Sequence, residues 1–209
     1  MSMKRFLISV FFVCVALAPA GAQLRMRDVF ASAPDSVFPL LTRNNRLDCI
    51  DFAENGMQAR VKNRFENVCE LKKLTDEYML MQLSERSTVE MRVLSDSLFC
   101  MIKTYRGPAP DSEVRFFDAS WHPVSVAMPN LPVESFWTSV PDSLRTEATF
   151  VQRSLSDLKL VHVTISPSEP IITCTLQTSE LERKDKELAQ RFVQPLMFRW
   201  DGQKFVPQL

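Results

Sequence analysis

Apolar and polar residues alternate through most of the chain between residues 59 and 118. Val89, Met91 and Val93 show the pattern most clearly, because a charged residue stands between each pair. A period of two is that of a β-strand with one buried face. The runs follow one another closely and are joined by short polar turns. This spacing predicts an antiparallel meander rather than β-α-β units.

The segment before this alternation has helical spacing, and we expect helices within residues 26–57. Pro34 or Asp35 is expected to begin one helix, because both residue types are common at helix starts. A second helix is expected to follow, with Asn44 or Asn45 as its N-cap.

The C-terminal part mixes helical and strand spacing. Asp142 is expected to cap a helix with one apolar stripe, formed by Leu144, Ala148, Val151 and Leu155. Two alternating runs, 161–165 and 172–176, predict strands. Ser179 to Glu182 has the spacing of a capping box for a last helix. The chain then closes with a hairpin across Asp201 and Gly202.

These elements predict an α+β fold with a largely antiparallel sheet and helices packed on one face. We expect an N-terminal half, 23–126, and a C-terminal half, 127–209, packed as one unit. The segment from Phe99 to Thr104 resembles the segment from Thr173 to Thr178. A duplication giving two similar halves is one explanation, and chance similarity between amphipathic strands is the other.

Residues 1–22 have the three-part pattern of a secretory signal peptide. Lys4 gives a positive start, Phe6 to Ala18 are apolar, and small residues lead to an expected cleavage between Ala22 and Gln23. A membrane anchor is the alternative, but the apolar run is shorter than the roughly 20 residues that a spanning helix needs. A lipid anchor would need a cysteine where Gln23 stands. We therefore expect a soluble periplasmic or secreted protein without a membrane span in the mature chain.

The chain has equal numbers of basic and acidic residues, 25 of each. Nucleic-acid binding requires a basic surface, so this balance argues against it. The glycines form no phosphate-binding motif, and the cysteines lack the spacing of a zinc site. We expect no cofactor and no metal. The cysteines that follow the leader are expected to be small core residues without disulfides, although an exported protein can form them: Cys49, Cys69, Cys100 and Cys174.

The densest polar cluster is the candidate ligand-binding site, formed by Asn44, Asn45, Asp48 and Asp51. On a helix, the two aspartates are three residues apart and share a face. Such a pair can bind a cation or act as acid and base. The alternative interpretation is an N-cap followed by a solvated helix face.

The sequence contains no recognisable catalytic motif, and no catalytic residue is predicted. Its two histidines, His122 and His162, lie in different halves. A pocket joining either one to a carboxylate and a serine or cysteine would favour a hydrolase. Exposed tryptophans would instead favour carbohydrate binding, and the candidates are Trp121, Trp137 and Trp200.

Several segments resemble a family of exported proteins of unknown function from Bacteroidales. The block from Asn44 to Phe52 is the most specific, and Met26 to Phe30 and Phe198 to Gly202 also fit. The resemblance covers essentially the whole mature chain. It implies export and an α+β fold, and it transfers no catalytic or binding residue.

Together these observations predict a non-catalytic envelope protein that binds another envelope protein or a peptide. Long antiparallel strands with open edges suit the addition of a partner strand. A carbohydrate or small-ligand binding protein is the first alternative, and a hydrolase with an unrecognised site is the second. The oligomeric state is not predicted.

Overall fold

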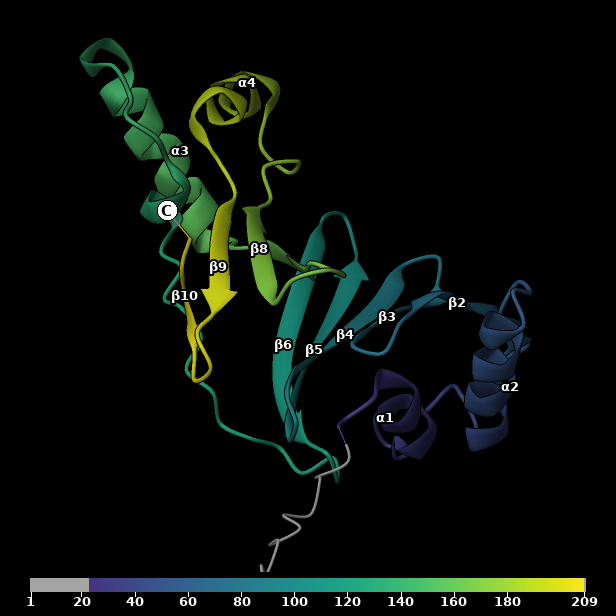
Figure 1. Cartoon of the computed structure of the whole chain (residues 1–209). Helices are drawn as coiled ribbons and strands as arrows, with labels where there is room; N and C mark the ends of the chain where they lie inside the picture. The colour runs from purple at the N-terminus through teal and green to yellow at the C-terminus, as the bar shows by residue number, and fades with distance from the viewer. Residues whose placement is uncertain (1–22, 209) are drawn as a thin grey trace, which may run out of the picture.

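A computed structural model describes residues 23–208, so the predicted leader lies outside the described residues. The strands form two antiparallel sheets, one of six strands and one of four (Figure 1). Helices α1 and α2 lie beside the large sheet, and α3 and α4 lie beside the small one. The α+β class is therefore confirmed.

The large sheet is an antiparallel meander whose strand order follows the chain. The predicted alternation from residue 59 to 118 corresponds to this sheet. Its longest pairing joins the last two strands, from Leu98 opposite Asp118 to Arg106 opposite Pro110. The strands are β1 (Arg60–Lys62), β2 (Val68–Leu74), β3 (Tyr78–Ser84), β4 (Ser87–Ser95), β5 (Leu98–Arg106) and β6 (Pro110–Asp118).

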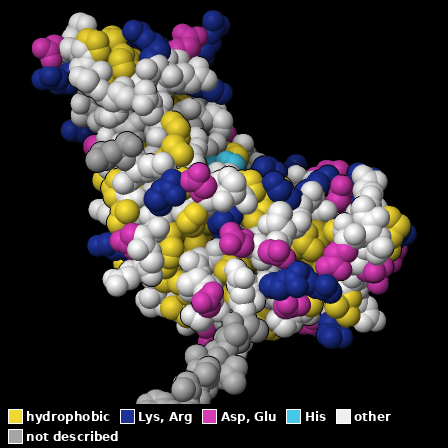
Figure 2. Space-filling view, viewed as in Figure 1, with side chains coloured by type: hydrophobic (Ala, Val, Ile, Leu, Met, Phe, Trp, Pro, Cys, Tyr) yellow, Lys and Arg dark blue, Asp and Glu magenta, His cyan; other side chains and the backbone are white. Residues whose placement is uncertain are grey.

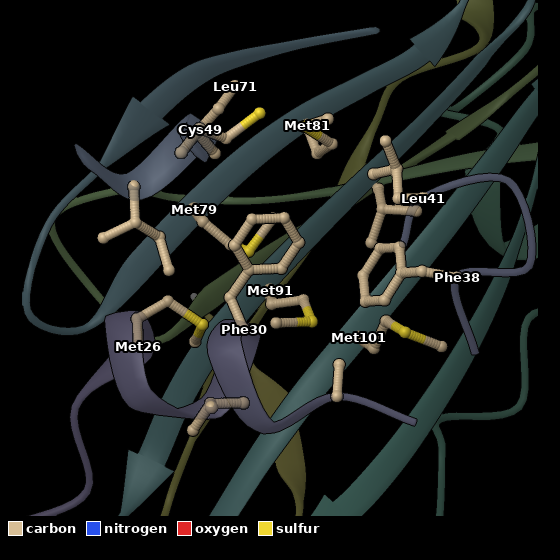
Figure 3. Close-up of a cluster of buried hydrophobic side chains, with 14 of the residues drawn as sticks. Met26, Phe30, Phe38, Leu41, Cys49, Leu71, Met79, Met81, Met91 and Met101 are labelled. Carbon is tan, nitrogen blue, oxygen red and sulfur yellow. The ribbon is translucent and has the colours of Figure 1, made fainter. Parts of the chain in front are cut away.

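One face of the large sheet is covered by α1 (Met26–Ser32) and α2 (Arg43–Glu54). Methionines from neighbouring strands meet Phe30, Phe38 and Leu41 in this layer (Figure 3). Methionine is unbranched and adaptable, and it fills the irregular space between a sheet and short helices. The prediction of helices on one face is confirmed for this sheet.

The expected helix from Pro34 or Asp35 is wrong, because residues 35–41 form turns. Arg46 holds this segment: its guanidinium is buried and donates to the carbonyl oxygens of Ala33 and Leu41. The expected cap at Asn44 or Asn45 is also wrong.

Thr42 is the N-cap of α2, and Asn45 is the third helical residue in a reciprocal capping box. The Asn45 N–H donates to the Thr42 hydroxyl at 3.1 Å, and the Asn45 side-chain oxygen accepts from the Thr42 N–H at 3.1 Å. Asparagine here occupies the position that glutamate or glutamine occupies in the common form of this motif.

The small sheet has the order β10-β9-β8-β7. It is reached from β6 through an irregular segment and two short 3-10 helices, η1 (Val133–Phe136) and η2 (Asp142–Leu144). Its strands and helices are α3 (Arg145–Asp157), β7 (Val161–Ile165), β8 (Ile171–Leu176), α4 (Arg183–Phe192), β9 (Leu196–Trp200) and β10 (Phe205–Pro207). The predicted hairpin at Gly202, whose φ is +104°, is confirmed.

Two predicted helix caps are wrong. Asp142 begins η2 rather than α3, and α3 itself starts at Arg145 without a side-chain cap. Its apolar stripe is nevertheless buried at Ala148, Val151 and Leu155. The Ser179 hydroxyl donates to the neighbouring Glu180 carboxylate, and α4 begins later, at Arg183.

A second core joins the two sheets. Cys100, Ile102 and Phe116 on the other face of the large sheet pack with the inner face of the small sheet and with α3. The Phe116 and Trp200 rings stack with their centroids 6.4 Å apart. The central strands of the large sheet are therefore covered on both faces.

Candidate functional site

Strand β7 docks onto the large sheet through its backbone. At one end of β7 the Ser166 N–H donates to Ile171 of β8, and at the other end Leu160 accepts from the Gln177 N–H that follows β8. The backbone groups of alternate residues point to opposite sides, so the N–H groups of Val161, Val163 and Ile165 point away from β8. Side chains of the large sheet accept two of the three. Asp111 accepts from Val161 at 3.0 Å, and Ser112 accepts from Val163 at 3.0 Å.

This edge-on docking leaves a concave corner on the outer side of the small sheet. We call it the corner hollow. It has a volume of about 540 Å³. Tyr78 and Glu90 of the large sheet line it, with Thr164 and Thr173 of the small sheet. Figure 2 shows a notch between the part of the molecule that carries α3 and α4 and the part that carries α1 and α2.

The floor of the corner hollow is polar and partly desolvated. The Tyr78 hydroxyl donates to the Glu90 carboxylate at 2.7 Å. Burial raises the pKa of Glu90, although the hydrogen bonds from Tyr78 and Ile165 oppose that shift. Burial also raises the pKa of the Tyr78 hydroxyl, and the hydrogen bond to Glu90 raises it further. The pair therefore holds a carboxylate in an environment that disfavours its charge.

Arg92 fastens the turn between β7 and β8 to the large sheet. Its side chain is 3 % exposed, and it donates to Glu77 at 2.8 Å and to the Ser166 carbonyl at 3.2 Å. Burial lowers the pKa of Arg92, while Glu77 and Glu169 oppose the shift. The arginine thus fixes one wall of the corner hollow.

The second candidate surface is the outer edge of β6. Ser112, Val114 and Phe116 direct their N–H and C=O groups away from β5. The Val124 N–H donates to the Phe116 carbonyl at 2.9 Å, but no residue of the described range pairs with the backbone groups of Val114. Unpaired backbone groups on a strand edge are a template for another strand.

An apolar hollow of about 370 Å³ lies beside this edge. Val114 and Phe116 form one wall, and Val124, Val126 and Met128 form the other. We call this surface the β6 groove. Val124 is 37 % exposed, so part of the apolar wall is open to solvent.

The other two free edges are less suited to pairing. On β1, the Lys62 carbonyl accepts from the Asn45 side chain at 3.3 Å, and the Arg64 N–H that follows donates to the Leu40 carbonyl. Strand β10 is only three residues long and ends at Pro207, which has no N–H.

The predicted ligand-binding residues lie on α2, away from both hollows. Asn45 caps the helix and covers the β1 edge. Asn44, Asp48 and Asp51 are exposed, and Asp51 accepts from the Asn55 side chain at 3.2 Å. Ligand binding by this cluster stays a prediction.

Among the described residues, neither histidine and none of the tryptophans lines the corner hollow or the β6 groove. His122 is exposed and lies 3.0 Å from Asp118 in a turn, while His162 is half-buried on β7. Trp121 and Trp200 are buried, and Trp137 is half-buried. This burial weighs against sugar stacking on these rings.

All four cysteines of the described range are buried, as expected of small core residues, and their thiols are free. Burial raises the pKa of Cys174 to about 11. Residues 23–208 contain no group of three or more His, Cys, Asp or Glu side chains placed to hold a metal ion. No helix within the same range is long and apolar enough to cross a bilayer.

Sequence reasoning missed the residues of both hollows. Glu90 lies between Val89 and Met91 and has the pattern of a solvent-facing residue. Val114 has the pattern of an ordinary strand residue. No motif marks either position, because each acquires its role from the way the small sheet and the linking segment pack.

The fold and these surfaces define an α+β protein with two antiparallel sheets and no recognised active site in its described part. The chain belongs to a family described as "Protein of unknown function (DUF3256)", whose model matches residues 20–205. The comparison with curated proteins gives no match.

A solved structure confirms the fold. A domain of an uncharacterized protein from Porphyromonas gingivalis W83 superimposes with a TM-score of 0.73 and is 23 % identical in sequence. The match covers 88 % of this chain and 97 % of that domain. This organism belongs to the Bacteroidales.

Proposed function

We propose that this is a non-catalytic protein of the cell envelope, periplasmic or secreted, that binds an extended peptide segment of another protein. The peptide adds to the large sheet along the β6 groove. One observation carries this proposal: the unpaired backbone groups of Val114 stand beside an apolar hollow. Main-chain pairing supplies affinity in such a mode, and side-chain pockets supply specificity.

The chain's own linking segment supports this interpretation. Residues 122–124 already pair in antiparallel fashion with the C-terminal end of β6, through the bridge between Phe117 and Pro123. The edge therefore accepts a strand. The segment then departs, and the edge from Ser112 to Val114 is left without a backbone partner in the described structure.

The same segment limits what can bind. A second copy paired symmetrically about Val114 would place its own Ser112 opposite Phe116, where Val124 lies. Moving the pairing centre to Ser112 would set Asp111 against Glu113 of the other copy, and like charges directly opposite are destabilising. A short peptide of another protein avoids both conflicts. Its alternate side chains should be apolar, to enter the hollow.

Selection from a random peptide display library tests the proposal. We expect enriched peptides with apolar residues at every second position. The Val114→Pro variant removes the outward N–H without removing a bond of the β5–β6 ladder, because that N–H does not point toward β5. Peptide affinity should fall at least about tenfold, since main-chain bonds carry this mode.

Lys62→Pro is the matched control, because it places the same residue on the opposite edge of the sheet. It should leave peptide affinity unchanged. In the unaltered protein, hydrogen exchange of the Val114 amide should slow when peptide is bound. Equal affinity for the Val114→Pro variant, or unchanged exchange at Val114, would refute binding at this edge.

The proposed location has its own test. The signal-peptide pattern predicts that the protein recovered from the periplasm or medium begins at Gln23. Cell fractionation followed by mass spectrometry of the N-terminal peptide measures this directly. A protein found only in the cytoplasm, with residues 1–22 still attached, would contradict the assignment.

A further inference from the structure

We propose that the corner hollow is a binding site for a primary ammonium group, with the Glu90 carboxylate as its counter-charge. This site is separate from the β6 groove and does not depend on peptide binding there. It lies on the outer side of the small sheet, where the half-buried Thr164 and Thr173 line it, whereas the β6 groove adjoins the core on the inner side.

The charge balance of the hollow favours a cation. Three charged residues line it: Glu90, Glu169 and Arg199. Glu169 and Arg199 form an ion pair of 2.6 Å with each other. Glu90 forms no ion pair within the described structure, so its carboxylate, when ionised, is the one charged group lining the hollow without a salt-bridge partner.

The hydrogen-bonding pattern favours an ammonium group in particular. Glu90 accepts from the Tyr78 hydroxyl, and an ionised carboxylate offers about four lone-pair directions, so most of its acceptor capacity is left over. Thr164 and Thr173 face each other across the small sheet, and their hydroxyls have no partner in the described range. An ammonium has three donors and no acceptor, which matches one carboxylate and two hydroxyl oxygens.

Arg106 is the competing cation of the protein itself. It is exposed, and it lies near enough to Glu90 to lower the pKa of that carboxyl against the effect of burial. It does not line the hollow and does not pair with Glu90. Removing its charge should therefore strengthen ammonium binding, whereas removing the charge of Glu90 should weaken it.

The ammonium can come from a lysine side chain of a partner or from a small free amine. Lysine with acetyl and N-methylamide blocking groups is the probe for the first source, and n-butylamine is the probe for the second. The norleucine compound with the same blocking groups is the control, since it lacks only the charged group. Tighter binding of the blocked lysine would indicate a polypeptide source, and tighter binding of butylamine would indicate a free amine.

Nuclear magnetic resonance titration of the labelled protein gives the measurement. We expect saturable shifts at the amides of Ile165 and Thr164 with either ammonium probe and none with the norleucine compound. Glu90→Gln keeps an oxygen to accept from Tyr78 and should weaken binding about tenfold, while Arg106→Gln should strengthen it about twofold. A loss of protein stability alone cannot lower the affinity for the ammonium probe in one variant and raise it in the other.

Glu85→Gln is the matched control, because Glu85 is an exposed acid outside the hollow. It should bind the probe as the unaltered protein does. The proposal is overturned if the ammonium probes cause no saturable shift at Ile165. It is also overturned if Glu90→Gln and Glu85→Gln bind them equally well.

Discussion

Replacing Ser112 by alanine removes one of the side chains that hold β7 on the large sheet. The Ser112 hydroxyl accepts from the Val163 N–H at 3.0 Å and bonds the Thr104 hydroxyl at 2.8 Å. Val163 is 4 % exposed and Thr104 is 2 % exposed, so both groups lose a partner while buried. Each such loss costs about 1–3 kcal/mol.

Ser112 itself is half-buried, so water can replace part of what is lost. We therefore place the total near the lower limit for two groups, about 2 kcal/mol of unfolding free energy. For a chain of this size, each kcal/mol lowers the melting temperature by about 2–4 °C. The expected fall is about 4–8 °C.

Urea unfolding and hydrogen exchange at Val163 measure the effect together. Ser112→Thr keeps the hydroxyl and should keep most of the stability, while Ser125→Ala changes an exposed serine without a described hydrogen bond. The reasoning is refuted if Ser112→Ala costs less than about 0.5 kcal/mol while the Val163 amide stays protected from exchange.

Three further predictions concern other parts of the molecule. Asn45→Ala should cost about 1 kcal/mol in urea unfolding, because it breaks a capping box, whereas Asn44→Ala on the exposed face should cost almost nothing; equal costs would contradict the assigned cap. Because burial raises the pKa of Glu90 above its ordinary 4.5, the folded state holds this proton more tightly than the unfolded state. The unfolding free energy of the protein, relative to that of its Glu90→Gln variant, should therefore decrease as pH rises through and above 4.5. Urea unfolding of both proteins at pH 4 and pH 8 measures this difference, and an equal or larger difference at pH 8 would contradict the prediction. In the native protein, the buried cysteines should stay unlabelled by a thiol reagent until urea is added, as measured by mass spectrometry. Rapid labelling of the native protein would disprove their burial. The four residues are Cys49, Cys69, Cys100 and Cys174.

The meander could be predicted because each of its strands buries one face and because the strands follow one another along the chain. Alternation such as that of Val89 and Met91 shows which residues share a face. It does not show which sheet a strand joins. Val161 to Ile165 and Val89 to Val93 have the same period, yet they belong to different sheets that meet edge to face. That relation depends on backbone directions, which no side-chain pattern records.

The first helices show a different limit. Pro34 and Asp35 have the chemistry of a helix start, but the segment is held in turns by Arg46 from the next helix. A contact made through tertiary structure overrides the local preference. For the cap of α2, the spacing of Thr42 and Asn45 was a usable signal, since each side chain can reach the other's N–H.

The candidate site was the least predictable part. Asn45 was predicted to bind a ligand because it belongs to a polar cluster, but its side chain forms its hydrogen bonds within the fold. Glu90 was not predicted as a site residue, because a charged residue in an alternating strand is normally solvated. Its partial burial arises from the small sheet, whose strands begin far along the chain.

The edge-on docking of β7 also sets an order for folding. The acceptors on β6 precede the N–H groups that they hold by 50 and 51 residues. As the chain is made from its N-terminus, the large sheet is complete at Asp118, while Ile102 and Phe116 still lack the small sheet that covers them. An apolar sheet face thus stays open during synthesis until the last quarter of the chain arrives, and chains that end before β7 retain a surface prone to aggregation.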